Sequence, residues 1–193
     1  MIIGITGGTG CGKTTLLTLI EEMGGVVLDC DAIYHRLLKT DKDLLYAIST
    51  RFPGTVTDGV LDRKKLGSIV FQDKAALLEL NRIAHGAVKQ EVLRLLNPEP
   101  ALAAIDAIAL FEGGLSELCK PTVAITAPLE DRVKRLILRD GISEEYARSR
   151  INAQRPQEEF VALCDVNLEN NGTKEQFREK CLAFLSGLGI MKP

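Results

Sequence analysis

The segment from position 7 to position 14 constrains the fold of this chain more than any other feature. It reads Gly-Gly-Thr-Gly-Cys-Gly-Lys-Thr and matches the phosphate-loop pattern Gly-x-x-x-x-Gly-Lys-[Ser/Thr]. An apolar run, Ile2–Thr6, precedes it, and a leucine-rich helical pattern follows it. A strand, a glycine-rich loop and a helix in this order predict an α/β fold that binds the phosphates of a nucleotide.

Each residue type in this loop has a chemical reason. Glycines allow the backbone to turn successive N–H groups inward around phosphate oxygens. The helix that follows adds the positive end of its dipole. Lys13 is expected to reach the β- and γ-phosphates, and the hydroxyl of Thr14 is expected to bind Mg²⁺. Motors, GTPases and kinases share such a loop, so the motif alone does not identify the reaction.

Short apolar runs recur along the chain and alternate with helical patterns, as in a mostly parallel sheet. Five runs are expected to be strands: Ile2–Thr6, Val26–Asp29, 103–111, Thr122–Thr126 and Val166–Glu169. The pattern between positions 32 and 97 is helical, and this segment is longer than a simple strand crossover requires. We therefore expect an inserted helical subdomain, with a proline-containing linker at 97–100.

A second helical region, from position 129 to 155, is rich in arginine. Gly141 is expected to end its first helix, and Ser143 to begin the next one. The arginines of this region are Arg132, Arg135, Arg139, Arg148, Arg150 and Arg155. They could form a solvated helix surface, or a lid that brings positive charge to bound phosphates.

Composition and charge exclude several classes of protein. The chain carries 24 Lys+Arg against 26 Asp+Glu, a balance that argues against a dedicated nucleic-acid binder. Its longest apolar stretch, 101–111, is interrupted by Asp106 and is too short to span a membrane. The first residues show neither a basic region nor a cleavage site, which disfavours secretion. Five unclustered cysteines are expected to be reduced thiols in the cytoplasm.

Motifs that the sequence lacks exclude two classes of phosphate-loop protein. A GTPase would carry Asp-x-x-Gly and Asn-Lys-x-Asp, and neither occurs in the sequence. The Leu-Ser-Gly-Gly signature of transport ATPases is also missing, because Leu185-Ser186-Gly187 is followed by Leu188. A small chain with an early helical insertion and a late arginine-rich helix pair is more typical of a small-molecule kinase with a lid.

Two aspartates follow the second expected strand. The carboxyl ends of parallel strands face the same crevice, so Asp31 is expected to open towards the bound phosphates. A carboxylate there can accept the proton of a hydroxyl group as its oxygen attacks the γ-phosphate. The alternative is that Asp31 caps the next helix. We interpret Asp31 as functional and Asp29 as structural.

Seven segments occur in the order in which they are found in dephospho-CoA kinases, and the chain resembles that family from residue 2 to about residue 172. They are Gly-Ile-Thr-Gly-Gly-Thr-Gly-Cys-Gly-Lys-Thr at 4–14, Asp29-Cys30-Asp31, Leu61-Asp62-Arg63-Lys64-Lys65-Leu66 with Val70-Phe71, Ile83-Ala84-His85, Leu110-Phe111-Glu112, Arg150-Ile151-x-x-Gln154, and Cys-Asp-Val-Asn-Leu-x-Asn-Asn-Gly at 164–172. The phosphate loop is generic, but its combination with Asp-x-Asp and the two late motifs is specific.

The resemblance implies transfer of the γ-phosphate of ATP to the ribose 3′-hydroxyl of dephospho-CoA, with Mg²⁺, as the last step of coenzyme A synthesis. It implies a P-loop kinase fold with a five-stranded parallel sheet core, an inserted helical substrate domain and a helical lid. The core would comprise residues 1–31, 101–127 and 160–193, the acceptor (CoA) domain residues 32–100, and the lid residues 128–159. No nucleic-acid or membrane partner is expected, and the oligomeric state stays open.

The resemblance also implies roles for individual residues. Asp31 would be the base, with Lys13 and Arg139 as further catalytic residues. Nucleotide binding would involve Thr9, Gly10, Cys11, Gly12, Lys13, Thr14, Thr15 and Arg150, with Asn170 and Gly172 near the adenine. Candidates for contact with the acceptor are His35, His85 and Glu112. A surface position for His35 and a packing role for His85 are the alternatives.

Three further expectations concern single side chains. Asp106 could bind Mg²⁺, but the apolar run continues past it, whereas such a carboxylate is expected at the end of a strand. Cys11 lies beside Lys13 at a helix start, which would lower the pKa of its thiol and make it sensitive to alkylation; the alternative is an inert thiol that points away from the bound phosphates. Replacing Arg132 is expected to be milder than replacing Arg139 or Arg150.

Two other functions remain open on the sequence. The first is a nucleoside- or nucleotide-type kinase that shares the core and the lid but takes another acceptor. The second is a catalytically silent ATP-binding module, against which the presence of both Lys13 and Asp31 argues.

Overall fold

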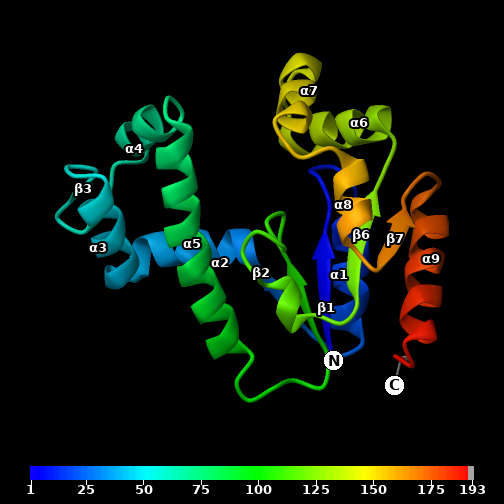
Figure 1. Ribbon diagram of the computed structural model, residues 1–193. Helices are drawn as coiled ribbons and strands as arrows, with labels where there is room; N and C mark the ends of the chain where they lie inside the picture. Colours follow the sequence, from blue (N-terminus) through cyan, green and yellow to red (C-terminus); the bar gives the residue numbers. More distant parts are fainter. Residues whose placement is uncertain (191–193) are drawn as a thin grey trace. The chain divides into compact units, whose positions relative to one another are not determined.

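The computed structural model describes residues 1–190 and contains a five-stranded parallel sheet (Figure 1). The strands lie in the order β2-β5-β1-β6-β7. Their bounds are Ile2–Thr6 for β1, Val26–Asp29 for β2, Ala103–Asp106 for β5, Thr122–Thr126 for β6 and Val166–Glu169 for β7. This sheet confirms the predicted α/β fold of a P-loop kinase, with β1 at its centre.

The third predicted strand was wrong at its carboxyl end. β5 ends at Asp106, which pairs with Ile5 of β1, and the chain then turns. The residues beyond it stay apolar because they are buried without being strand: Ala107 is 5% exposed and Leu110 is fully buried. Hydrophobicity here reports burial rather than strand geometry.

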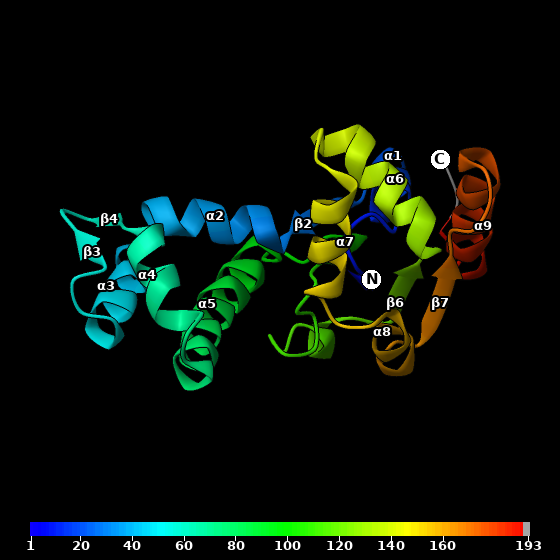
Figure 2. The same cartoon turned by 90° about the horizontal axis from the view of Figure 1, so that it is seen from above.

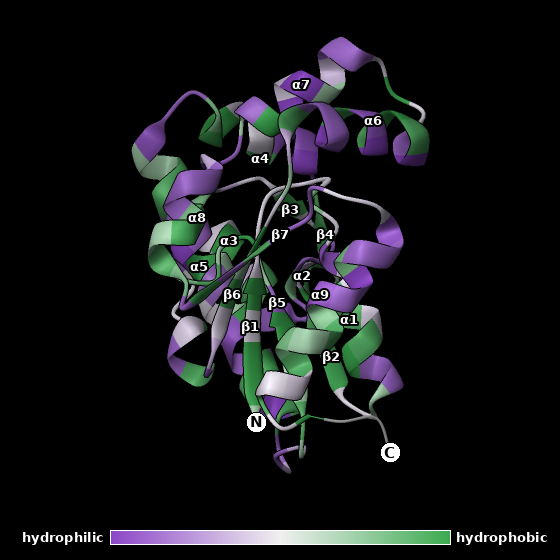
Figure 3. Cartoon of the chain, turned by 90° about the vertical axis from the view of Figure 1, so that its right-hand side faces the viewer, coloured by the Kyte–Doolittle hydropathy of each residue, from purple (hydrophilic) through white to green (hydrophobic). Residues whose placement is uncertain are grey.

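Helices cover both faces of this sheet. α1 (Lys13–Glu22) and α9 (Lys174–Gly187) lie on one face, and α8 (Gln157–Leu163) lies on the other, as Figure 3 shows. Ile3 and Ile5 of β1 pack with Leu16 of α1 and Phe177 of α9 in one buried cluster. This core fixes the start of α1, and therefore the phosphate loop, against the centre of the sheet.

The arginine-rich region forms two helices, α6 (Leu129–Asp140) and α7 (Glu144–Asn152). Both predicted boundary residues are confirmed. Gly141 ends α6 with a φ of 66°, and the side chain of Ser143 accepts a hydrogen bond from the Tyr146 N–H at the start of α7. Val133 and Leu136 of α6 pack with Ala147 and Ile151 of α7 in a small cluster of their own.

The segment between β2 and β5 is mostly helical, as predicted. It contains α2 (Cys30–Thr40), α3 (Lys42–Arg51), α4 (Arg63–Val70) and α5 (Lys74–Leu95), and α2, α3 and α4 each contact α5 (Figure 2). Each of the four helices begins after an aspartate whose side chain accepts backbone N–H groups: Asp29, Asp41, Asp62 and Asp73. A short hairpin of β3 (Val56–Thr57) and β4 (Val60–Leu61) was not predicted.

The chain divides into two compact units. Unit 1 contains residues 1–28, 100–111 and 115 onward, and unit 2 contains residues 29–99 and 112–114. Unit 1 includes the five-stranded sheet, the phosphate loop, α6 and α7, whereas unit 2 includes α2 to α5. No helix among residues 1–190 is long and apolar enough to cross a membrane.

Candidate active site

The phosphate loop lies between β1 and α1 in unit 1. Three of its glycines have positive φ angles, 139° at Gly7, 79° at Gly10 and 94° at Gly12, which other residues rarely adopt. A β-carbon on Gly10 would lie 2.9 Å from the Arg132 carbonyl oxygen, so glycine also lets α6 approach the loop. Lys13, the first residue of α1, donates from Nζ to the Gly7 carbonyl oxygen at 3.1 Å.

Asp106 lies beside this lysine. Its Oδ1 is 3.7 Å from Lys13 Nζ, and both side chains are mostly buried. Since β5 ends at Asp106, the reason given from the sequence against a metal role for this carboxylate was wrong. The carboxylate of Asp106 and the exposed hydroxyl residue Thr14 supply the hard oxygen donors that Mg²⁺ prefers.

Three side chains hold the outer side of the loop through its carbonyl groups. Arg132 Nε donates to the Thr9 oxygen at 3.0 Å, and Arg135 Nη1 donates to the Gly10 oxygen at 3.1 Å and the Cys11 oxygen at 3.3 Å. Asn170 Nδ2 donates to the same Cys11 oxygen at 2.9 Å. The carbonyl groups of three successive loop residues, Thr9 to Cys11, therefore accept hydrogen bonds from side chains that lie outside the loop.

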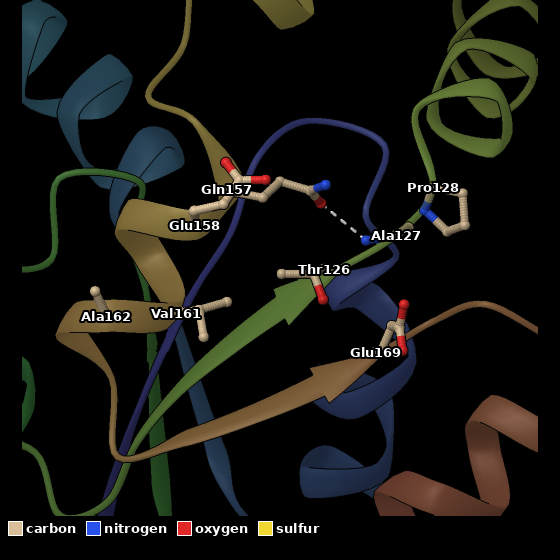
Figure 4. A pocket seen from close by; sticks show the side chains of 8 residues that line it. All are labelled: Thr126, Ala127, Pro128, Gln157, Glu158, Val161, Ala162 and Glu169. Atoms are coloured by element: carbon tan, nitrogen blue, oxygen red, sulfur yellow. Dashed lines mark hydrogen bonds between the residues drawn. The ribbon is translucent and has the colours of Figure 1, made fainter.

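Two glutamine side chains, those of Gln154 and Gln157, accept hydrogen bonds from the phosphate loop. Gln154 Oε1 accepts the Thr9 N–H at 2.8 Å, just after α7. Gln157 Oε1, at the start of α8, accepts the Ala127 N–H at 2.9 Å, as Figure 4 shows, and the Cys11 thiol at 3.5 Å. No role was predicted for Gln157, and Gln154 was named only as part of a motif shared with a family. Nothing local to either residue indicates a contact with a loop about 145 positions away.

The cavity in Figure 4 is not suited to phosphate. It has a volume of about 410 Å³ and lies between α8 and the carboxyl ends of β6 and β7. Its charged lining residues are both acidic, Glu158 and Glu169, and would repel a phosphate group. Three positive side chains of unit 1, those of Lys13, Arg132 and Arg135, instead contact the phosphate loop.

The expectation for Cys11 was wrong. The side chain is fully buried, and this burial raises the pKa of its thiol above the ordinary value. Arg132, Lys13 and Arg135 oppose the shift, but they do not outweigh the loss of hydration. The thiolate that alkylation requires is therefore disfavoured at Cys11.

The two predicted lid arginines, Arg139 and Arg150, meet at one carboxylate. Asp140 receives Arg139 Nε at 2.7 Å and Arg150 Nη1 at 2.6 Å. Hydrogen bonds from Arg139 and then Arg150 lower the pKa of Asp140 to about 2. Arg132, which is only 4% exposed, reaches the loop instead, although its replacement was expected to be milder than that of Arg139 or Arg150, and Arg135 reaches the loop as well.

In unit 2, the structure separates the two aspartates that follow β2. Asp29 caps α2, because its carboxylate accepts the Ala32 N–H at 2.9 Å. Asp31 lies in the first turn of α2 and is exposed, so it is not the cap. His35 is exposed one helical turn later. The buried side of α2 carries Ile33 and other apolar residues, which fix the helix so that Asp31 and His35 share its open face.

The remaining predicted acceptor residues are also in unit 2. His85 is half-buried in α5, and Glu112 is exposed in the short 112–114 segment. Gly172, predicted to lie near the adenine, has a structural reason to be glycine. A β-carbon there would lie 2.4 Å from Gln176 Oε1, which accepts the Thr173 N–H in the capping box of α9.

Comparison with known proteins gives concordant matches. The family model described as Dephospho-CoA kinase matches residues 1–176. The dephospho-CoA kinase of Carboxydothermus hydrogenoformans is 36% identical over 95% of this chain and 92% of the relative. A crystal structure from Thermus thermophilus has 35% identity and a TM-score of 0.79, covering 97% of both chains. A dephospho-CoA kinase structure from Campylobacter jejuni has 26% identity and a TM-score of 0.68, covering 98% of both chains.

Proposed function

The chain belongs to the dephospho-CoA kinase family, and on that premise we propose that Asp31 takes the proton of the acceptor hydroxyl while Lys13 and the lid arginines stabilise the transferred phosphate. The reaction is the ATP-dependent phosphorylation of the 3′-hydroxyl of dephospho-CoA, which gives CoA and ADP and is the final step of CoA biosynthesis. The roles of individual residues follow from their surroundings.

The observation that supports Asp31 as the base is the cap on α2. Capping was the one competing use for Asp31, and Asp29 performs it. The carboxylate of Asp31 is therefore exposed and available to a ligand at the start of the helix. β2 ends two residues earlier, and the carboxyl ends of parallel strands share one edge of a sheet. Such a carboxylate can accept a hydroxyl proton as the oxygen attacks phosphorus.

Charge stabilisation requires cations against the phosphate oxygens. Lys13 is held beside the loop by the Gly7 carbonyl and Asp106, so its ammonium group is oriented before the nucleotide binds. Thr14 and Asp106 would hold Mg²⁺, which neutralises phosphate charge when bound. Arg139 and Arg150 are held by Asp140 and can exchange this carboxylate for phosphate when the lid closes.

Two segments of the chain are assigned different roles in the reaction. We propose that the helical segment 32–100 binds dephospho-CoA, and that 128–159, which contains α6 and α7, acts as the lid. His35 and His85 on α2 and α5, and Glu112, are candidate contacts for the acceptor. We propose the cytoplasm as the site of action, where ATP is available and the five thiols can stay reduced.

An acceptor panel tests the reaction. The protein is incubated with Mg-ATP and, separately, with dephospho-CoA, AMP, UMP or shikimate, and ADP release is measured. We expect ADP only with dephospho-CoA. Background ADP with dephospho-CoA, together with turnover on another acceptor, would establish the rival nucleotide-type kinase. Background ADP with every acceptor, together with ATP binding, would indicate the silent module.

The lid arginines give a second test. Arg139→Ala and Arg150→Ala are each expected to lower kcat by at least about tenfold and to change ATP affinity less, because their contacts with phosphate form only in the closed state. Arg148→Ala is the matched control on α7, since Arg148 pairs with Glu130 and Glu144 on the surface. If kcat is near the wild-type value for all three variants, the arginines form only a solvated helix surface and the lid role is wrong.

A further inference from the structure

The contact between Arg132 and the phosphate loop has a consequence for the direction of a backbone N–H. Arg132 Nε donates to the Thr9 carbonyl oxygen, which points outward from the loop towards α6. In a trans peptide, the carbonyl of one residue and the N–H of the next point in opposite directions. A hydrogen bond that holds the Thr9 oxygen outward therefore aims the Gly10 N–H inward, where phosphate binds.

Gln154 binds the backbone N–H of Thr9, the residue whose carbonyl group Arg132 binds. Its Oε1 accepts the Thr9 N–H at 2.8 Å, so the peptide groups before and after Thr9 are both fixed by side chains from the 128–159 region. We call Arg132 and Gln154 the Thr9 clamp. Arg135 and Asn170 hold the Cys11 carbonyl outward as well, which aims the Gly12 N–H in the same way. The Cys11 N–H, in contrast, donates to the Gly8 carbonyl oxygen within the loop at 3.3 Å.

Arg132 differs from the other side chains that hold the loop because it is a buried cation. The side chain is 4% exposed, and its Nη2 is buried without a hydrogen-bond partner among residues 1–190. A β-carbon on Gly8 would lie 2.4 Å from this Nη2, so the charge lies directly against the loop. A buried cation is costly unless an anion compensates it. A bound triphosphate would supply such an anion, although Arg132 need not touch it.

We propose that Arg132 and Gln154 are positioning residues that fix the first turn of the phosphate loop for ATP, with Arg132 aiming the Gly10 N–H through the Thr9 carbonyl. The proposal rests on the ATP-dependent function given above. It also links the lid region to the loop, because both side chains of the clamp come from the segment that carries α6 and α7.

The test compares Arg132→Met, Arg132→Gln and Lys134→Met. Methionine removes the charge and the donor, whereas glutamine removes the charge but can still donate to the Thr9 oxygen. Lys134→Met removes one positive charge from an exposed position on the same helix and is the matched control. ATP dissociation constants are measured by calorimetry without acceptor, next to melting temperatures and the KM for dephospho-CoA.

We expect Arg132→Met to weaken ATP binding by roughly 10-fold or more, the scale of a hydrogen bond to a charged group. Arg132→Gln should recover affinity to within about threefold of wild type, and Lys134→Met should change it by less than about twofold, on the same scale. The KM for dephospho-CoA should stay the same in all three. Equal ATP affinities for Arg132→Met and Lys134→Met would overturn the proposal, as would equal weakening by methionine and glutamine.

Gln154→Met keeps the test decisive if Arg132→Met does not fold. Gln154 is half-buried and its replacement removes only the acceptor of the Thr9 N–H. We expect about threefold to tenfold weaker ATP binding, the scale of a neutral hydrogen bond, and unchanged affinity would contradict the clamp. ATP binding is read without acceptor, so a wild-type protein that binds ATP but does not phosphorylate dephospho-CoA would refute the function and leave this comparison valid.

Discussion

Replacing Asp31 with asparagine is expected to lower kcat by roughly 10²–10⁴-fold, the usual contribution of a general base. Asparagine keeps the shape of the side chain but cannot accept the proton of the acceptor hydroxyl. ATP binding should change little, because the phosphate loop, with Lys13, is untouched. The measurement is steady-state kinetics with dephospho-CoA, together with calorimetry of ATP binding.

Asp29→Asn is the matched control for this variant. The chemical change is the same, two residues earlier, and asparagine serves as a helix cap as well as aspartate does. Its kcat should stay within about threefold of wild type. The assignment of the base would be wrong if Asp31→Asn also stayed within that range, or if both variants lost activity equally.

Replacing Lys13 with methionine is expected to lower kcat by roughly 10²–10³-fold, as removal of a group that stabilises developing charge does. Methionine keeps most of the length of the side chain but carries no charge. Metal-free ATP should also bind more weakly, because the ammonium group attracts the phosphates directly. Both quantities are measured on the same preparation, with a melting curve as the control for folding.

Because Lys13 lies beside Asp106, the loss of kcat in Lys13→Met has a second explanation, a buried carboxylate whose neighbouring cation has been removed. A second variant separates the two explanations. Asp106→Asn alone should weaken ATP binding in the presence of Mg²⁺ and leave metal-free binding unchanged. The Lys13→Met/Asp106→Asn double variant should remain inactive. Activity restored in the double variant would show that the two residues only compensate each other's charge.

Local patterns predicted the parts of the molecule that local interactions determine. The phosphate loop, four of the five strands and the caps Gly141 and Ser143 each depend on residues adjacent in sequence. β5 was predicted too long because residues 107–111 are apolar for packing in a turn. Hydrophobicity cannot distinguish a buried turn from a buried strand, so the position of Asp106 at the strand end was missed.

The candidate site was harder to predict, because its contacts connect distant segments. The sequence showed that six arginines cluster between 132 and 155, but helical periodicity does not say which of them faces the loop. Arg132 and Arg135 do, while Arg139 and Arg150 pair with Asp140. For Cys11, neighbouring charges were visible in the sequence, whereas desolvation is a property of the folded chain and dominates the shift in its pKa.

The placement of β1 in the middle of the sheet has a consequence for the order in which the chain can fold. β1 is synthesised first, but its neighbours β5 and β6 follow only after the whole of α2 to α5, and the N-terminal amino group bonds Ala101 across 100 residues. Closing so long a loop is entropically unfavourable until many contacts form together. On the ribosome, the helices between β2 and β5 can therefore become structured while the nucleotide-binding strand is still unpaired, and the loop is complete only when Asn170 emerges.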